Sequence, residues 1–163
     1  MWDSAVAHLV VAVNADQFDE LARWAGDHDG IAQMSGSQGL VTLFVHASSL
    51  DSYREGVLAA AEKLRSQGFT VVGLDLDLVN TTDIADRTGR SRQAIRQYSE
   101  GLRGPQGFPA PLGEPGGVRV WDWGSVNEWL RTSGLGGDPE YHPTREVIAD
   151  LSTALQNPMA PAR

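Results

Sequence analysis

The chain has 163 residues, 41% hydrophobic and 21% charged, which is the composition of an ordinary globular protein of one domain or two small ones. It contains no cysteine, which excludes disulfides and thiolate metal sites, and no apolar run near the roughly 20 residues that span a bilayer. We therefore expect a cytoplasmic protein with no membrane segment and no secretory leader.

The net charge of -8 is distributed unevenly along the chain. Residues 1–80 hold 11 acidic and 4 basic side chains, whereas residues 81–133 hold 6 acidic and 7 basic ones. The remaining segment, 134–163, holds 4 acids and 2 bases. The middle segment is therefore the part of the chain best suited to a polyanion, although it must rely on where its arginines are placed.

Residues 1–79 alternate between strand-like and helix-like patterns. Asn14, three residues before Gln17, has the spacing of a capping box, and Gly68 is placed to end a second helix. Four apolar strands and two amphipathic helices in the order β-α-β-β-α-β predict an α+β domain with a ferredoxin-like sandwich. The expected strands are 8–13, 31–35, 40–46 and 70–79, and the expected helices follow Asn14 and Ser48 or Ser49.

This first domain offers no catalytic constellation. Asp75 and Asp77 stand two residues apart on one expected strand face, but no nucleophile or metal ligand accompanies them. His8, His28 and His46 lack the spacing of metal ligands. We expect no enzyme activity, no cofactor and no metal, and we assign the domain to dimerisation or to binding a protein or small-molecule effector.

Residues 80–101 predict two helices joined by a sharp corner. Asn80 and Ser91 are placed to cap them, and Gly89 supplies the positive φ that such a corner needs. The second helix, expected over 91–101, turns its arginine and glutamine side chains outward. Such a face suits a DNA major groove, where arginine bonds guanine or phosphate and glutamine bonds adenine.

A segment rich in proline and glycine follows and predicts a two-stranded wing over 108–121. Its turn is Gly113-Glu-Pro-Gly-Gly, and Arg119 lies near its tip, where it could meet a phosphate or the minor groove. A third helix follows, with Val126, Trp129 and Leu130 turned inward.

These motifs together resemble the MerR/excisionase-type winged helix-turn-helix. The resemblance covers residues 80–131, through Asp83-Ile84-Ala85, Gly89, Ser91-Arg92, Phe108-Pro109, Arg119 to Trp121, Trp123, Val126 and Trp129. It implies DNA binding by the second helix and the wing, with the aromatic residues in the core. The DNA-binding residues so assigned are Arg90, Ser91, Arg92, Gln93, Arg96, Gln97, Arg103 and Arg119.

The resemblance does not extend to metal sensing, because the chain lacks the long dimerising helix and the effector ligands of MerR activators. The additional domain also precedes the winged helix instead of following it. After the expected domain of 80–133, residues 134–163 predict a flexible link, an amphipathic helix over 144–155 that docks on the same chain or on a second copy, and a disordered tail.

The sequence thus predicts a homodimeric, sequence-specific DNA-binding transcriptional regulator, of the repressor type. Two alternatives stay open: an excisionase-like architectural factor that bends DNA, and an antitoxin or adaptor that binds proteins through the acidic first domain.

Overall fold

The computed structural model describes residues 2–157 as a mixed α+β protein with an antiparallel sheet. Two compact units divide the chain, Met1–Asp75 with Glu146–Arg163 and Leu76–Arg145. The predicted C-terminal segment, 134–163, therefore contributes to both units. Among the described residues, no helix has the length and apolar character required to cross a membrane.

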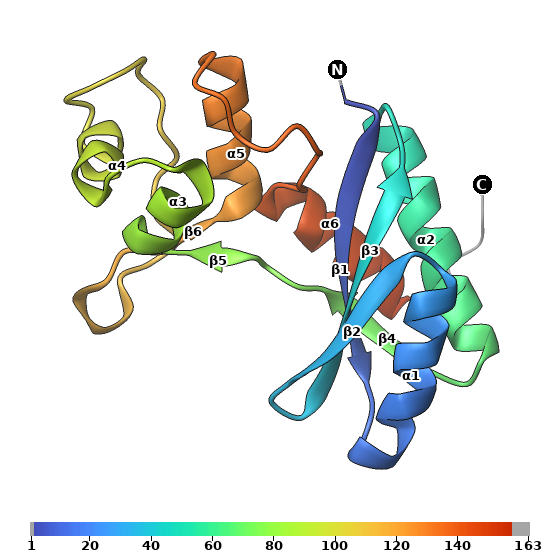
Figure 1. Cartoon of the computed structure of the whole chain (residues 1–163). Helices are drawn as coiled ribbons and strands as arrows, with labels where there is room; N and C mark the ends of the chain where they lie inside the picture. Colours follow the sequence, from blue (N-terminus) through green and yellow to red (C-terminus); the bar gives the residue numbers. More distant parts are fainter. Residues whose placement is uncertain (1, 158–163) are drawn as a thin grey trace. The chain divides into compact units, whose positions relative to one another are not determined.

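The first unit is built on a four-stranded sheet with the strand order β2-β3-β1-β4 (Figure 1). All three strand pairs are antiparallel, and β1 lies in the interior between β3 and β4. A tight turn at Gly36, with φ 63°, joins the two strands that pair at the β2 edge. The strands are β1 (Ser4–Ala12), β2 (Gly30–Ser35), β3 (Gln38–His46) and β4 (Thr70–Leu74).

Two helices, α1 (Ala15–Asp27) and α2 (Leu50–Ser66), pack on one face of this sheet (Figure 1). Both begin with the capping arrangement that the sequence predicts, at Asn14 and Ser49. The strands alternate buried and exposed side chains because only one face meets the helices. The shared core includes Leu9, Val11, Leu21, Val41, Val57 and Leu64.

A third helix, α6 (Arg145–Gln156), packs beside β4. Its Ser152 side chain accepts a hydrogen bond from the Leu74 amide at 3.0 Å and lies where a side chain on Gly73 would stand. Gln156 donates to the Val72 carbonyl at 3.3 Å, and Arg65 of α2 donates to the Leu155 carbonyl. The predicted amphipathic helix therefore docks on its own chain; the predicted tail, 158–163, lies outside the described residues.

The single strand expected over 70–79 is wrong: the segment forms two strands in two different sheets. β4 ends at Leu74, and β5 (Leu78–Val79) pairs with β6 (Trp121–Asp122). The alternation of Leu74, Leu76 and Leu78 suggested one buried face, but only Leu74 is buried, whereas Leu78 is 51% exposed. The alternation of leucines thus continues into the connection between β4 and β5, where Leu76 and Leu78 are exposed and join neither hydrophobic core.

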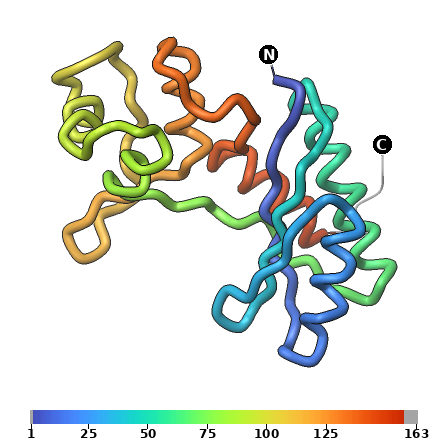
Figure 2. The backbone as a smooth tube through the Cα atoms, in the orientation of Figure 1, coloured from blue at the N-terminus to red at the C-terminus, as the bar shows by residue number. Residues whose placement is uncertain are grey.

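The second unit is a group of short helices around an aromatic cluster. Figure 2 shows its chain path, in which two extended loops separate α4 from α5. Its elements are β5, α3 (Thr81–Thr88), α4 (Arg92–Ser99), a single 3-10 turn (Pro115–Gly117), β6 and α5 (Trp123–Thr132). Its core holds Val79, Ile84, Ala85, Ile95, Tyr98, Trp121, Trp123, Val126, Trp129 and Leu130.

Candidate nucleic-acid interface

The bounds of α3 and α4 are set by two side-chain caps and one glycine. The Asn80 side chain accepts from the Asp83 amide, and the Asp83 side chain accepts from the Asn80 amide, both at 2.9 Å. Gly89 then takes the left-handed conformation, with φ 66°, that ends α3. Ser91 accepts from the Ala94 amide at 3.0 Å and starts α4. The expected corner is confirmed at the level of local structure.

The two faces of α4 differ sharply in polarity. Ala94, Ile95 and Tyr98 are buried, and Ile95 and Tyr98 join the core that α3 and α5 share. The opposite face carries only polar and cationic side chains, and Arg92, Gln93 and Arg96 are exposed. The outward face is therefore free to contact a ligand without disturbing the packing beneath it.

A hairpin from Gly113 to Val120 projects from the short β5-β6 sheet, as the light-orange loop of Figure 2 shows. Its ends are joined by an isolated antiparallel bridge, with Val120 donating to the Gly113 carbonyl at 3.0 Å and Leu112 to the Val120 carbonyl at 2.8 Å. The regular strand at the end of the hairpin is Trp121–Asp122, which pairs with β5, so the expected two-stranded wing is reduced to the single bridge between Gly113 and Val120. The glycine and proline residues of this loop favour a turn, and they leave few backbone hydrogen bonds for a regular pair of strands.

The exposed face of α4 and this hairpin border one groove of about 960 Å³. Three arginines, Arg92 and Arg96 from α4 and Arg119 from the hairpin, lie along it. Two glutamates also line it, and Glu114 stands 3.9 Å from the Arg119 Nε. Six of the eight predicted residues meet here: Ser91, Arg92, Gln93, Arg96, Gln97 and Arg119.

The other two predicted residues, Arg90 and Arg103, do not line the groove. Arg90 is half-buried, and its guanidinium donates to the Leu135 carbonyl at 2.8 Å and to the Tyr98 hydroxyl at 3.4 Å. The Arg103 guanidinium lies 5.7 Å from the centre of the Tyr98 ring. Arg90 therefore ties the end of α3 to Tyr98 and Leu135, whereas Arg103 is exposed beside Tyr98.

Two threonines at the start of α3, Thr81 and Thr82, line the same groove and are absent from the sequence prediction. Hydroxyls beside the first turn of a helix can donate to a phosphate, as can the free amides there. The Asn80 capping signal already marked this helix start. Only the fold could show that it lies beside α4 and the hairpin.

Aromatic contacts hold the loop before the hairpin against the helices. Trp121 is 1% exposed, and its Nε1 donates to the Pro109 carbonyl at 2.9 Å. The Phe108 ring lies edge-on to both Trp121 and Trp129, at centroid distances of 5.7 and 5.0 Å. The aromatic residues are thus core residues, as the sequence predicts, and they fix the base from which the hairpin extends.

The segment after α5, expected to be a flexible link, is bound to that helix. The buried Asn127 side chain accepts from the Asp138 amide at 2.6 Å and donates to the carbonyl of the same residue at 3.1 Å. Gly124 is needed in α5, because a Cβ there would stand 1.9 Å from the Pro143 carbonyl oxygen. Polar side-chain contacts of this kind leave no periodic signal in a sequence.

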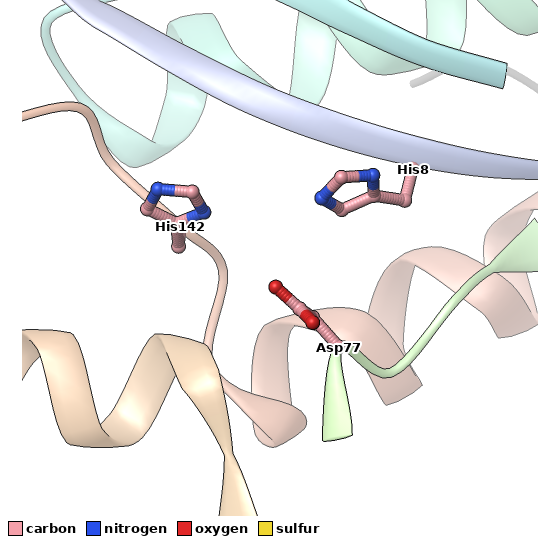
Figure 3. A group of neighbouring side chains, drawn as sticks. All are labelled: His8, Asp77 and His142. Atoms are coloured by element: carbon pink, nitrogen blue, oxygen red, sulfur yellow. The ribbon is translucent and has the colours of Figure 1, made fainter. Parts of the chain in front are cut away.

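This segment also brings together groups that could ligate a cation. The His142 Nε2 lies 2.7 Å from an Asp138 carboxylate oxygen, and Glu140 offers a further oxygen within 4.8 Å. The Asp77 carboxylate, just before β5, also lies within 4.8 Å of His142; Figure 3 labels both residues. The Asp77 carboxylate is already held by both terminal nitrogens of Arg87, at 2.7 and 2.9 Å. His8, also labelled there, belongs to the first unit and lies 3.0 Å from the Thr42 hydroxyl.

Two ionisable groups of the second unit have shifted pKa values. The hydrogen bonds that Arg87 donates to the Asp77 carboxylate raise the pKa of Arg87, whose guanidinium also lies 5.1 Å from the centre of the Trp123 ring. Burial, reinforced by the charge of Glu128, raises the pKa of Tyr141 to about 12. Both residues support the scaffold, since neither lines the groove.

Comparisons of the chain with protein-family models, with curated proteins and with solved structures found no match.

Proposed function

We propose that the protein is a DNA-binding transcriptional regulator that holds double-stranded DNA in the groove between α4 and the Gly113–Val120 hairpin. In this proposal the second unit is a winged helix-turn-helix, α4 enters the major groove, and the hairpin meets the backbone or the minor groove. In this proposal the protein acts in the cytoplasm.

One observation carries the proposal: Arg92 and Arg96 on α4 and Arg119 on the hairpin share one open groove with two glutamines. Arginine is the usual partner of phosphate and of guanine, and glutamine can form two hydrogen bonds to adenine. The side chains of α4 belong to one helix face, so they can follow a single duplex groove together.

The charge distribution sets a condition on this proposal. The whole protein carries a net charge of -8, so long-range attraction to DNA is weak and contact must come from the placed arginines. A homodimer with two half-sites would multiply the affinity of one such unit. We assign that dimerisation to the first unit, whose strand order and two covering helices support a ferredoxin-like sandwich.

The test compares two variants that remove the same amount of charge. Arg92→Ala/Arg96→Ala empties the groove of its α4 arginines, whereas Arg23→Ala/Arg54→Ala removes two arginines from α1 and α2. Fluorescence anisotropy with labelled duplexes, selected from genomic fragments that the protein retains, measures the binding of each. If each groove arginine contributes about 1–3 kcal/mol, the first variant loses about 2–6 kcal/mol of binding free energy, which is roughly 30-fold or more in affinity.

The control variant should bind within a few-fold of the parent protein. The groove variant should also flatten the dependence of log K on log salt concentration, by about one unit for each arginine that contacts a phosphate. Equal losses in both variants would contradict the proposal. The absence of any binding by the parent protein at low salt would instead favour a protein-binding adaptor, and a large bend with little sequence preference would favour an architectural factor.

A further inference from the structure

The outer edge of β2 is the least protected part of the first unit. β2 pairs with β3 on one side, and no other strand of the described chain pairs with it. The unpaired amides and carbonyls of such an edge can pair with a strand of another molecule.

The opposite edge of the same sheet is protected. There, Ser152 and Gln156 of α6 hydrogen-bond to the backbone of Leu74 and Val72. Helix α6 thus bonds to the backbone of β4, whereas no strand or helix within residues 2–157 is seen to bond to the outer edge of β2.

The sequence around β2 lacks the residues that normally keep edges apart. Natural edge strands carry charges, prolines or bulges that prevent pairing. Residues 30–50 contain no Asp, Glu, Lys, Arg or Pro, and this is the longest run without charge in a chain that has 34 charged residues. Ile31 on β2 is 69% exposed and Met34 is 41% exposed. The edge is therefore both unpaired and apolar.

We infer that β2 pairs antiparallel with β2 of a second copy, joining two four-stranded sheets into one of eight strands. A second copy fits this edge because a strand without charge meets no like charge when it faces itself, and a two-fold axis makes such a contact self-complementary. The inference rests on the homodimer of the proposed function and names its surface.

Symmetry restricts the register. The two-fold axis of such a pair passes through its centre, perpendicular to the sheet, so that the helices of both copies cover the same side. In that arrangement one residue of β2 lies opposite the same residue of the second copy. The centre of Gly30–Ser35 lies at Ala32 and Gln33, so one of these two is the self-paired residue. Directly opposed residues have Cα atoms about 4.5–5.5 Å apart, within the range that a disulfide spans.

The absence of cysteine makes the cross-linking test unambiguous. Under mild oxidation, Ala32→Cys or Gln33→Cys should form a covalent dimer, whereas Ala59→Cys on the exposed side of α2 should not. Cross-linking of neither β2 variant, or of all three variants equally, would overturn the inference.

A second measurement separates the edge from the face of the sheet. Sedimentation equilibrium without DNA should show that the parent protein is a dimer. The salt concentration is high enough to screen the repulsion between the α1 carboxylates of the two copies. Ile31→Lys should raise its dissociation constant about tenfold or more, because it places a like charge on both copies at the paired edge, as natural edge strands do to prevent pairing. Phe44→Lys is the matched control, since Phe44 is 52% exposed on the same face but belongs to the inner strand β3.

The control should dimerise like the parent protein. A parent protein that stays monomeric at all concentrations, or a dimer that Phe44→Lys disrupts and Ile31→Lys does not, would overturn the inference. Because neither measurement contains DNA, the inference can fail while the proposed DNA binding holds, and the reverse.

Discussion

The two units of the protein differ in the length of their helices, in the composition of their cores and in the charge of their surfaces. The first has helices of 13 and 17 residues and a sheet that buries one continuous core, and its exposed surface is mostly acidic apart from one uncharged hairpin. The second has two helices of only 8 residues each, too short to be stable alone, and a core of three tryptophans, one tyrosine and a few aliphatic side chains. Three of its arginines, Arg92, Arg96 and Arg119, line the groove.

The second unit depends on few buried residues. Each short helix contributes two or three buried residues, so the aromatic cluster must supply most of the stabilisation. The first unit spreads the same task over many strand and helix positions. Substitutions in the second unit should therefore have larger and more local consequences.

The largest expected effect comes from Trp121→Ala. Trp121 is almost wholly buried and bonds the Pro109 carbonyl, so its loss should destabilise the second unit by about 3–5 kcal/mol. Hydrogen exchange resolved by residue should show the loss in 76–145. Equal loss of protection in the β1–β3 strands would show that the two units do not differ in the way described.

A smaller effect is expected in the groove. Glu114→Gln removes the carboxylate that stands 3.9 Å from Arg119, on an exposed pair. It should tighten DNA binding by about 0.2–1 kcal/mol, at most a fivefold change in affinity. Anisotropy titrations measure it, with Glu128→Gln on α5 as a control of equal charge change outside the groove. An equal gain in the control would show that net charge, and not the position of Glu114, is responsible.

A third effect concerns alkaline stability. Burial raises the pKa of Tyr141 from 10.0 to about 12, so above pH 10 the unfolded chain releases the Tyr141 proton before the folded chain does. Folding stability from this group is therefore present below pH 10 and is lost as the pH rises toward 12. Denaturant unfolding should show a shallower loss of stability over this window in Tyr141→Phe; identical pH dependences would contradict the assignment.

Much of the fold is predictable from the sequence where local signals dominate. The capping residues Asn14, Ser49, Asn80 and Ser91 all begin the helices expected of them. The outward face of α4 follows from helical periodicity alone, which is why most of the predicted site residues share the groove.

The failures share a physical cause: they depend on tertiary partners. The alternation through Leu76 and Leu78 is typical of one strand, but β5 pairs with β6 more than 40 residues away. Arg90 looks like an outward cation, yet it bonds the Leu135 carbonyl. The segment at Asp138 looks flexible until the buried Asn127 is placed beside it.

The central claim is that the groove between α4 and the hairpin binds DNA, and nuclear magnetic resonance tests it most directly. A ¹H–¹⁵N spectrum of this 17.6 kDa chain resolves both the amides and the arginine Nε–H groups. Titration with a retained duplex should shift the Nε–H signals of Arg92, Arg96 and Arg119 and leave those of Arg23 and Arg54 unchanged. Shifts confined to 1–75, or saturable binding without a change at these three arginines, would contradict the claim.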